Sequence, residues 1–452
     1  MAIKQEFKKY LEEAIGVENA HVAFSAFNEP ASVSIRYNPY KKNKCLENFL
    51  DTKNVEWSEY GRILKERPVF TLDPYFHAGC YYVQDSSSMF VGEVFRRYID
   101  KNINSRPYLV LDLCAAPGGK TTDLAASLRQ IYGDNFLLVA NEVVRQRAVT
   151  LADNVSLWGD PNVIVSSNDP LAFAKLPGFF DVIVADVPCS GEGMFRKDEE
   201  AQNQWSEANV ALSQARQRRI VADAWSSLRE GGLFIYSTCT FNKLENDDNV
   251  EWIAKELGAE IFEQELDFKG VLKTKSGYSL IPGFVSGEGQ YCSAMRKTSS
   301  QKEANLRPKN VKTSSVLQDL TKLFIKDVVL VQKGETIIAQ PTKLSSYVNI
   351  LAQALQLQVS GCTVGNLKGK KLIPSADLSL SIILNNEAFP SVELTKDQAL
   401  EYLHRDVIYL PEAPKGFIRV KYDGVALGFV KNLGARCNNL HPQNRRIRMD
   451  IK

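Results

Sequence analysis

Residues 111–122 read LDLCAAPGGKTT, and the prediction of the architecture starts from them. The apolar run 108–113 predicts a buried strand, and the segment 120–128 that follows predicts a helix. Small residues and glycines at such a junction let the backbone approach a ligand, to which the start of the helix offers free N–H groups. The stretch matches neither GxGxxG nor GxxxxGK(S/T), so it indicates a nucleotide-like cofactor loop that is neither a dinucleotide fingerprint nor a P-loop.

Strands and helices alternate throughout the region around this loop. Such alternation predicts βαβ units and a mostly parallel sheet, so we expect an α/β domain over residues 76–297. A strand at 233–236 is expected to close this half of the chain. The other expected strands are 135–140, 163–166 and 180–185, and the other expected helices are 143–157 and 206–228.

The chain has 452 residues, which is too long for one ordinary domain and suggests roughly two to four. Residues 1–75 combine an amphipathic helix at the N-terminus with short strands such as 32–37. Residues 298–315 are polar and basic and are expected to form a linker. Short alternating β runs beyond this linker predict two small β-rich modules, 316–375 and 376–452.

The composition is typical of a globular protein with a sizeable core, since 44% of the residues are hydrophobic and 24% are charged. The formal net charge is only +2, but basic residues dominate the stretch 296–312 and the stretch from 415 to the end. A local excess of this kind can bind phosphate backbones, and it is equally typical of a solvated linker and tail.

The eight cysteines form no CxxC pair, and the four histidines are scattered. This pattern is typical of a reducing compartment and argues against a disulfide scaffold or a zinc site, so no metal is expected. The sequence shows no signal peptide and no apolar run long enough to span a bilayer. We therefore expect a cytoplasmic protein with no membrane partner, and we expect a monomer.

Carboxylates end the strands that follow the cofactor loop. Glu142 comes about 20 residues after the loop, where a carboxylate commonly accepts hydrogen bonds from ribose hydroxyls. Asp169 ends the third strand, where it can contact an adenine. The loop and these carboxylates together predict an adenosine-containing cofactor. The candidate cofactor-binding residues are Cys114, Ala115, Ala116, Pro117, Gly118, Gly119, Lys120, Glu142, Arg147, Asp169 and Asp186.

Two cysteines follow predicted strands in short loops. Cys189 lies in DVPCSG and Cys239 in YSTCT. A single cysteine after a strand is more often a small buried hydrophobic residue than a nucleophile. Two thiols at the carboxyl edge of one sheet, with Asp186 and a cofactor loop, instead suggest covalent chemistry beside a bound cofactor. The residues alone do not rank the two thiols.

The motifs DLCAAPGGKTT, DVPCSGEGMFRKD and YSTCT resemble the signature of RNA (cytosine-5) methyltransferases of the Nol/Nop/Sun type. The resemblance is dense over 76–297 and thinner over 34–39. Residues 416–420 and 428–431 resemble the PUA-like tail of the bacterial small-subunit rRNA methyltransferase F-like branch. The resemblance implies a Rossmann-like class I methyltransferase fold that uses S-adenosylmethionine. It also implies an N-terminal α+β RNA-binding region and a PUA-like RNA-binding module.

The resemblance also implies roles for four catalytic residues. Carbon 5 of cytosine is a poor nucleophile until a thiolate adds to carbon 6. By resemblance, Cys239 is this nucleophile and Cys189 assists product release. Asp186 would stabilise protonation at ring nitrogen 3, and Lys120 would lower the pKa of the nucleophile or orient the base. Gln290 stands where the family commonly has an aromatic residue, so the resemblance does not define that edge of the substrate site.

RNA is the partner that this chemistry requires, because the target base must leave its stack to enter a pocket. The basic residues expected to form an electropositive track are Lys41, Lys42 and Lys44, the linker, and Arg445, Arg446 and Arg448. The substrate implied by the tail is 16S rRNA. The alternatives are tRNA methylation, a catalytically silent ribosome assembly factor, and a nicotinamide-dependent oxidoreductase, for which the paired thiols would have no role.

Overall fold

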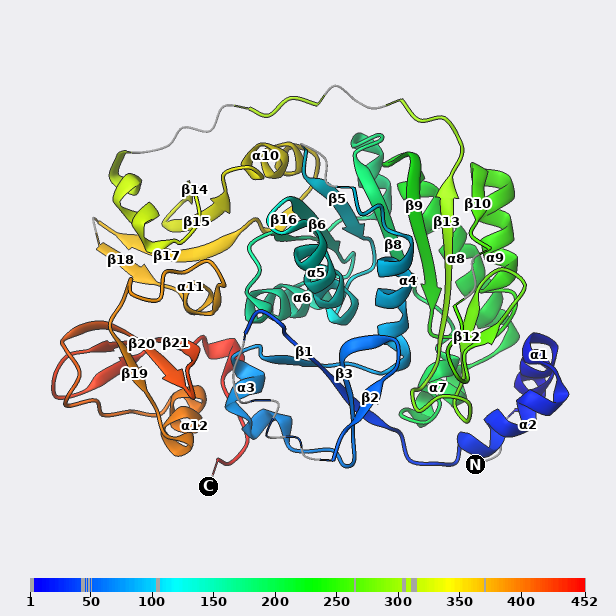
Figure 1. The fold of residues 1–452 in the computed structure, drawn as a ribbon, viewed down its shortest axis with the longest axis horizontal. Coiled ribbons are helices and arrows are strands. Elements are labelled where there is room, and N and C mark those ends of the chain that lie inside the picture. Colours follow the sequence, from blue (N-terminus) through cyan, green and yellow to red (C-terminus); the bar gives the residue numbers. More distant parts are fainter. Residues whose placement is uncertain are drawn as a thin grey trace.

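The computed structural model describes residues 4–41, 45, 47, 49, 51–102, 106–263, 266–302, 306–309, 315–369 and 371–451. A ten-stranded mixed sheet forms the centre of the molecule, and three four-stranded sheets belong to the N-terminal and C-terminal parts of the chain (Figure 1). In the part of the chain that is described, no helix is both long and apolar enough to cross a membrane.

The central sheet has the strand order β11-β12-β13-β9-β8-β5-β6-β7-β16, with β10 paired to β13. Its middle strands run parallel, and nearly all of their residues are buried because helices cover both faces. This confirms the expected α/β fold class. The parallel strands are β5 (Tyr108–Asp112), β6 (Phe136–Asn141), β7 (Val163–Ser166), β8 (Phe180–Asp186) and β9 (Leu228–Thr238).

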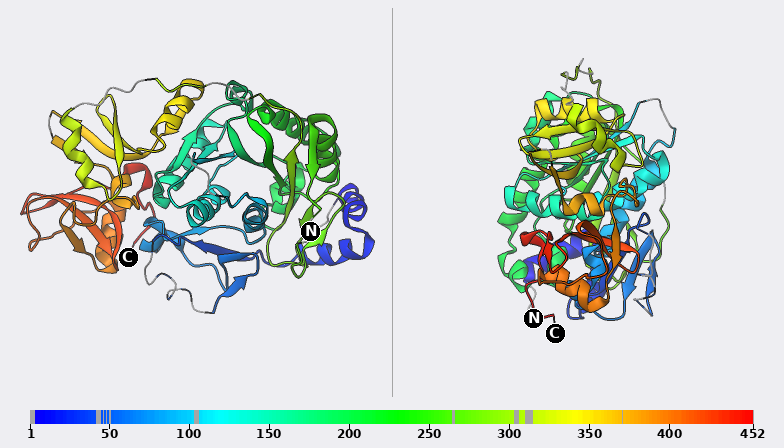
Figure 2. Two further views of the ribbon diagram at one scale, coloured as in Figure 1. Left: turned by 45° about the horizontal axis from the view of Figure 1, so that its top comes forward. Right: turned by 90° about the vertical axis from the view of Figure 1, so that its left-hand side faces the viewer.

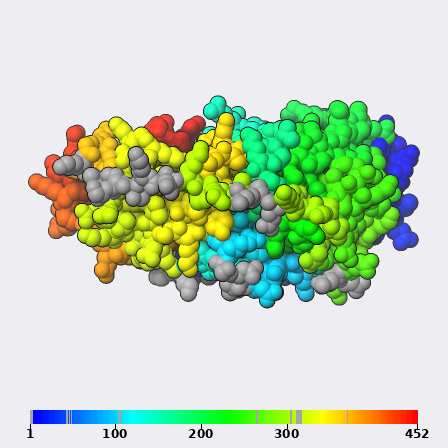
Figure 3. Space-filling model, turned by 90° about the horizontal axis from the view of Figure 1, so that it is seen from above, coloured from blue at the N-terminus to red at the C-terminus, as the bar shows by residue number. Residues whose placement is uncertain are grey.

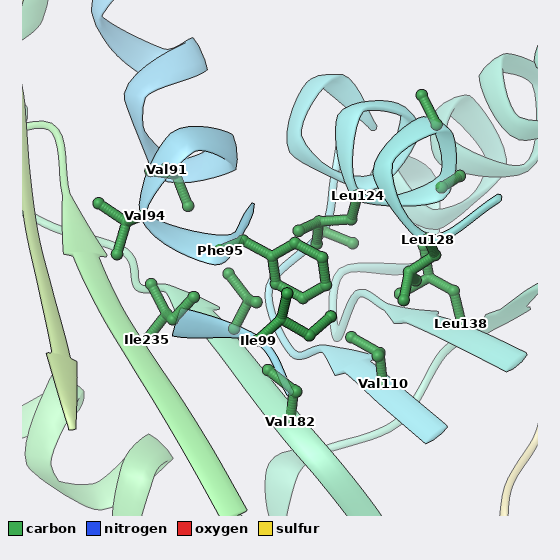
Figure 4. Close-up of a cluster of buried hydrophobic side chains, with 14 of the residues drawn as sticks. Val91, Val94, Phe95, Ile99, Val110, Leu124, Leu128, Leu138, Val182 and Ile235 are labelled. Atoms are coloured by element: carbon green, nitrogen blue, oxygen red, sulfur yellow. The ribbon is translucent and has the colours of Figure 1, made fainter. Parts of the chain in front are cut away.

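Each face of this sheet has its own apolar core. On one face, Phe95 of α4 and Leu124 of α5 pack against Val110 and Val182 of the strands (Figure 4). Alternate strand residues such as Leu111 point to the other face, which α8 covers. The helices on the two faces are α4 (Phe90–Tyr98), α5 (Gly119–Tyr132) and α6 (Arg145–Trp158), and α8 (Glu207–Trp225) and α9 (Asp247–Trp252).

The sheet does not close at the strand expected over 233–236. That strand is longer, and β13 pairs antiparallel with it, with Tyr291 opposite Thr238. The edge beyond β9 therefore carries four short or antiparallel strands that the alternation pattern did not predict. These are β10 (Ala259–Ile261), β11 (Leu272–Lys273), β12 (Tyr278–Leu280) and β13 (Gln290–Lys297).

The opposite edge is completed from far along the chain. β16 (Leu357–Val359) pairs antiparallel with β7, and α10 (Ser345–Ala354) places Val348 and Leu351 in the second apolar core. The segment 316–375 thus contributes to the central sheet as well as forming its own. Its own sheet contains β14 (Val328–Lys333), β15 (Thr336–Pro341), β17 (Cys362–Lys368) and β18 (Lys371–Pro374). In Figure 3, atoms of this segment (yellow) lie against those of the central domain (cyan to green).

The N-terminal region holds two helices and a small antiparallel sheet. Phe7 and Leu11, on the predicted apolar face of the first helix, are buried against Phe195 and Trp205 of the central domain. The elements are α1 (Gln5–Ile15), α2 (Val17–Ala26), β1 (Val33–Tyr37), β2 (Lys53–Val55), β3 (Ser58–Leu64), α3 (Pro74–His77) and β4 (Tyr81–Val83).

The C-terminal module packs against this N-terminal region. Tyr75 and Tyr81 share one apolar cluster with Leu400 and Ile418, so α3 and the small N-terminal sheet lie beside the C-terminal module, whereas α1 and α2 lie at the opposite end of the molecule (Figure 2). The remaining elements are α7 (Glu199–Gln204), α11 (Ala376–Leu380), β19 (Ser391–Glu393), α12 (Lys396–His404), β20 (Gly416–Tyr422), β21 (Val425–Asn432) and β22 (Cys437–Asn439).

Candidate active site

The two thiols that the sequence singled out lie together. β8 and β9 are parallel neighbours with Asp186 opposite Ser237, so the loops that follow them lie side by side. Cys189 Sγ and Cys239 Sγ are 3.0 Å apart, and both thiols are free and partly exposed. The structure therefore brings both predicted sulfur atoms to one point at the carboxyl edge of the sheet.

Asp186 and Lys120 form an ion pair at the same edge. Lys120, in the first turn of α5, places Nζ 2.9 Å from Asp186 Oδ2 and donates to Ser88 Oγ at 2.9 Å. The other carboxylate oxygen accepts hydrogen bonds from Ser237 Oγ at 2.7 Å and from Gln290 Nε2 at 3.1 Å. Both oxygens of the carboxylate are thus held in place.

Sequence reasoning missed these supporting residues. Ser237 lies within the YSTCT motif and Ser88 within the QDSSS stretch, but nothing in the sequence shows that they reach Asp186 or Lys120. Gln290 was noticed only as a departure from the family pattern. In the structure its amide also donates to Thr238 O at 2.9 Å, which ties β13 to the end of β9.

Charges and hydrogen bonds shift the pKa of two of these groups. Burial alone would lower the pKa of Lys120, but the Asp186 carboxylate outweighs it and the pKa is raised. The hydrogen bond to Cys239 and burial raise the pKa of the Cys189 thiol well above its ordinary value. Lys120 is therefore a fixed cation, and Cys189 is a thiol that keeps its proton at neutral pH.

A buried polar network, which no pattern in the sequence predicts, lies beneath the thiol loops. Glu245 Oε2 accepts hydrogen bonds from Ser190 N at 3.0 Å and Gln217 Nε2 at 2.7 Å, directly behind Cys189. Glu192 accepts from Phe241 N at 2.6 Å and from Trp205 Nε1 at 2.9 Å. Burial and the neighbouring Glu192 raise the pKa of Glu245 to about 7. These carboxyl groups connect the loops that carry the two thiols.

The loop before α5 has the features of a ligand cradle. Gly118 adopts φ 116°, a conformation that favours glycine, and Arg147 Nη2 donates to Ala116 O at 2.8 Å. Glu142 is buried at the end of β6 and lies 3.4 Å from Arg147 Nη1. Asp112 Oδ1 is buried and has no hydrogen-bond partner in the part of the chain that the structure describes. These residues fit an adenosine-containing cofactor.

Two other residues expected to bind the cofactor, Cys114 and Asp169, differ in exposure. Burial raises the pKa of the Cys114 thiol, which is consistent with a packing role for this side chain. Asp169 is exposed, and its carboxylate caps the short helix after β7 by accepting from Leu171 N at 3.0 Å. It also lies 3.5 Å from Arg219 Nη1. Each oxygen of the Asp169 carboxylate thus has one partner within the protein and can accept a further hydrogen bond from a cofactor.

One basic residue expected to face RNA is used within the fold. Arg445 pairs with Asp153 at 2.9 Å and with Asp377 at 2.8 Å, and its side chain is only 12% exposed. The expectation that Arg445 faces RNA is therefore wrong, because this side chain is mostly buried and two carboxylates neutralise its charge. Arg446 and Arg448 are exposed, and Lys42, Lys44 and Lys312 lie outside the described residues.

Comparison with known proteins defines the family. Family models match the chain as 16S rRNA methyltransferase RsmB/F (102–296), N-terminal domain of 16S rRNA methyltransferase RsmF (3–86) and methyltransferase RsmF PUA domain (389–447). A ribosomal RNA small subunit methyltransferase F from Enterobacter sp. (strain 638) is 29% identical over 97% of this chain and 95% of that protein. The protein of that name from Salmonella paratyphi A is 30% identical over 81% of this chain and 78% of its own length.

Solved structures share the fold. A methyltransferase homolog protein from Pyrococcus horikoshii superposes with a TM-score of 0.55 at 24% identity, covering 65% of this chain and 95% of that one. NSun6 from the same organism, solved with the S-adenosylmethionine analogue SFG, has a TM-score of 0.54 at 17% identity, covering 66% and 99%. The fold and the site define a methyltransferase that uses S-adenosylmethionine. The chain belongs to the ribosomal RNA small subunit methyltransferase F family, with a C-terminal PUA domain.

Proposed function

We propose that this protein methylates carbon 5 of a cytosine in 16S rRNA through a transient bond between Cys239 and carbon 6 of the base. The observation that carries the proposal is the pair of sulfur atoms 3.0 Å apart beside the Asp186–Lys120 ion pair. A reaction that needs both a nucleophile and a group to assist its departure accounts for two thiols at one point.

Cys239 would begin the reaction by adding its sulfur to carbon 6 of the inserted cytosine. The ring then gains electron density at carbon 5, and the proton that the Cys239 thiol gives up balances the added negative charge at ring nitrogen 3. Asp186 is the group we assign to that position, where it holds the proton on the nitrogen. Its two oxygens are fixed by Lys120, Ser237 and Gln290, so little reorganisation is needed as charge develops.

S-adenosylmethionine supplies an electrophilic methyl group when it is bound. We assign the binding of S-adenosylmethionine to the loop 114–119 and to Lys120, Glu142, Arg147, Asp169 and Asp186. Glu142, at the end of β6, is suited to accept hydrogen bonds from the ribose hydroxyls. Arg147 supports this loop through its hydrogen bond to Ala116 O.

Cys189 is assigned to the end of the reaction, when the proton on carbon 5 leaves and the bond to Cys239 breaks. The pKa of Cys189 is raised, and its sulfur lies 3.0 Å from that of Cys239. Cys189 would give its proton to the departing sulfur, and the thiolate left behind would accept the proton of carbon 5. The sulfur–sulfur contact is the same from either side, so the assignment of Cys239 as the nucleophile and Cys189 as the residue that assists release rests on the resemblance of YSTCT and DVPCSG to the motifs of the family.

The experiment that tests the proposal is a labelling assay. The protein is incubated with radiolabelled S-adenosylmethionine and total bacterial RNA, rRNA and tRNA fractions are separated, and the labelled nucleoside is identified after digestion. We expect label in 16S rRNA as 5-methylcytidine. Label in tRNA alone would overturn the choice of substrate, and a different methylated nucleoside would overturn the chemistry. Absence of label in both fractions would favour an assembly factor.

A further inference from the structure

A cleft of about 480 Å³ lies away from the thiols, where three parts of the chain meet. Its walls come from the turn after β1, from the segment around the end of α11 and from the β20–β21 hairpin. Figure 1 shows α11 between this hairpin and α6. Among the described residues that line the cleft there is no aspartate or glutamate.

Arg419 of β20 contributes a buried positive charge to this cleft. Its residue is only 7% exposed. Nη1 donates to Asn386 Oδ1 at 2.9 Å, Nε donates to Ser379 Oγ at 3.3 Å, and Nη2 donates to Ser379 O. All three acceptors are uncharged. In the ranges that the structure describes, no carboxylate forms an ion pair with this guanidinium, and burial lowers the pKa of Arg419 to about 10.

A second positive charge lies close to the first. Lys41, in the turn after β1, also lines the cleft, and its Nζ donates to Ala78 O at 2.7 Å and to Leu157 O. Burial and the charge of Arg419 lower the pKa of Lys41 to about 8. Asp423 of the hairpin accepts from the Tyr75 hydroxyl, and Glu393 of β19 accepts from the backbone N–H of Gly424 at the rim, but neither carboxylate lines the cleft. The cleft is therefore electropositive.

Such an arrangement favours an anion. A buried guanidinium without a counter-ion is costly, and its unused N–H groups match the oxygens of a phosphate. We propose that this cleft binds a phosphate of the RNA backbone, with Arg419 as the main ligand. The inference rests on the proposed function for its choice of RNA, since the cleft joins the N-terminal region to the PUA domain, two parts that one RNA strand could contact together. A volume of about 480 Å³ also accommodates the attached sugar.

Two variants test this site in the full-length protein. Arg419→Gln removes the charge, and Asn386→Asp, at an exposed position, adds a carboxylate beside Nη1 that neutralises it without removing the arginine. Lys322→Gln is the matched control, because this exposed lysine already pairs with Asp319 at 3.0 Å. Affinity for a 16S rRNA fragment is measured at several salt concentrations, and the thermal unfolding midpoint of each variant reports its folding.

We expect both variants to weaken rRNA binding about tenfold and to reduce the slope of log affinity against log salt by about one, while the control changes neither. Asn386→Asp should also raise the unfolding midpoint, so it tests the site even if Arg419→Gln folds poorly. An unchanged slope in Asn386→Asp would overturn the proposal. Thermal protection by inorganic phosphate or AMP that needs Arg419, without an effect on rRNA binding, would also overturn it and assign the cleft to a small anion.

The outcome is separable from the chemistry of the thiols. If the two variants weaken rRNA binding but the product is not 5-methylcytidine, the phosphate site stands and the proposed reaction fails. If the product is 5-methylcytidine and the variants bind rRNA like the unchanged protein, the reaction stands and the phosphate site fails.

Discussion

At the scale of single residues, the position of Asp186 depends on neighbours that are distant in sequence. Ser237 and Gln290 come from two different strands, and both donate to Asp186 Oδ1. Their hydrogen bonds fix a carboxylate that must face the base as charge develops. Losing one such bond should affect turnover more than substrate binding.

Ser237→Ala removes the shorter of these two hydrogen bonds. We expect kcat to fall about tenfold with little change in KM for rRNA, since a hydrogen bond to a charged group is worth about 1.5–3 kcal/mol. Steady-state methylation kinetics measure the effect. Ser279→Ala is the control, because the Ser279 hydroxyl is buried with no partner in the described chain. An equal loss in both variants would contradict the positioning role of Ser237.

Asp112 predicts a pH dependence of folding stability. Burial raises its pKa to about 7, so between pH 4 and pH 7 the folded state binds a proton that the unfolded state has lost. The free energy of unfolding should therefore decrease as the pH rises through this window and level off above it. Asp112→Asn should reduce the decrease between pH 5 and pH 7.5 by about 2 kcal/mol. Chemical unfolding of the free protein at several pH values measures it.

Asp319→Asn provides the comparison for this experiment, because the Asp319 side chain is 88% exposed and the substitution removes no buried carboxyl group. If Asp112→Asn followed the same profile as the unchanged protein, Asp112 would not hold the proton assigned to it.

The sequence predicted the reactive side chains of the site, but it did not predict the residues that hold them in place by hydrogen bonds. Cys189 and Cys239 could be predicted to lie close together because both follow strands of one parallel sheet. The hydrogen bonds of Ser88, Gln290 and Glu245 could not, because each depends on how separate loops or an antiparallel edge strand fold against the parallel core.

At the scale of elements, the edge of the central sheet is the main feature that the sequence did not reveal. β16 has only three residues, too few for a periodic signal, and it lies far along the chain from its partner β7. The parallel strands were predictable because each is a nearly continuous buried apolar run. The partners of short edge strands are set by tertiary contacts.

Leu351→Ala tests whether α10 belongs to the central domain. Leu351 is fully buried in the second apolar core, so its loss should lower the free energy of unfolding of this domain by about 2–5 kcal/mol. Leu212→Ala on α8 is the control, since that side chain is 63% exposed. Chemical unfolding followed by tryptophan fluorescence reports both. A loss no larger than that of the control would indicate that α10 is a separate unit.

At the scale of the whole molecule, the part of the N-terminal region around α3 and β4 and the PUA domain stabilise each other. The cluster that joins Tyr75 and Tyr81 to Leu400 and Ile418 makes the N-terminal region and the PUA domain one packed unit. Arg36 of β1 in turn donates to Gly119 O and Thr122 Oγ1 beside the cofactor loop. The parts expected to contact RNA are thus connected to the catalytic domain by apolar packing and hydrogen bonds.

Removing residues 389–452 should weaken rRNA binding by about tenfold or more and leave S-adenosylmethionine affinity unchanged. The thermal midpoint should also fall, because the cluster around Tyr75 loses its apolar cover. A cut at residue 298 would be less informative, since it also strips β16 and α10 from the central sheet. Filter binding and calorimetry measure the two affinities. Unchanged rRNA affinity would contradict a role for this module in binding.

The central claim is that Cys239 bonds to the base and that Cys189 assists the breaking of that bond. The most direct measurement is a denaturing gel of Cys189→Ala and Cys239→Ala after incubation with 16S rRNA and S-adenosylmethionine. We predict a covalent protein–RNA adduct that accumulates in Cys189→Ala and is absent in Cys239→Ala. An adduct in Cys239→Ala, with none in Cys189→Ala, would contradict the account.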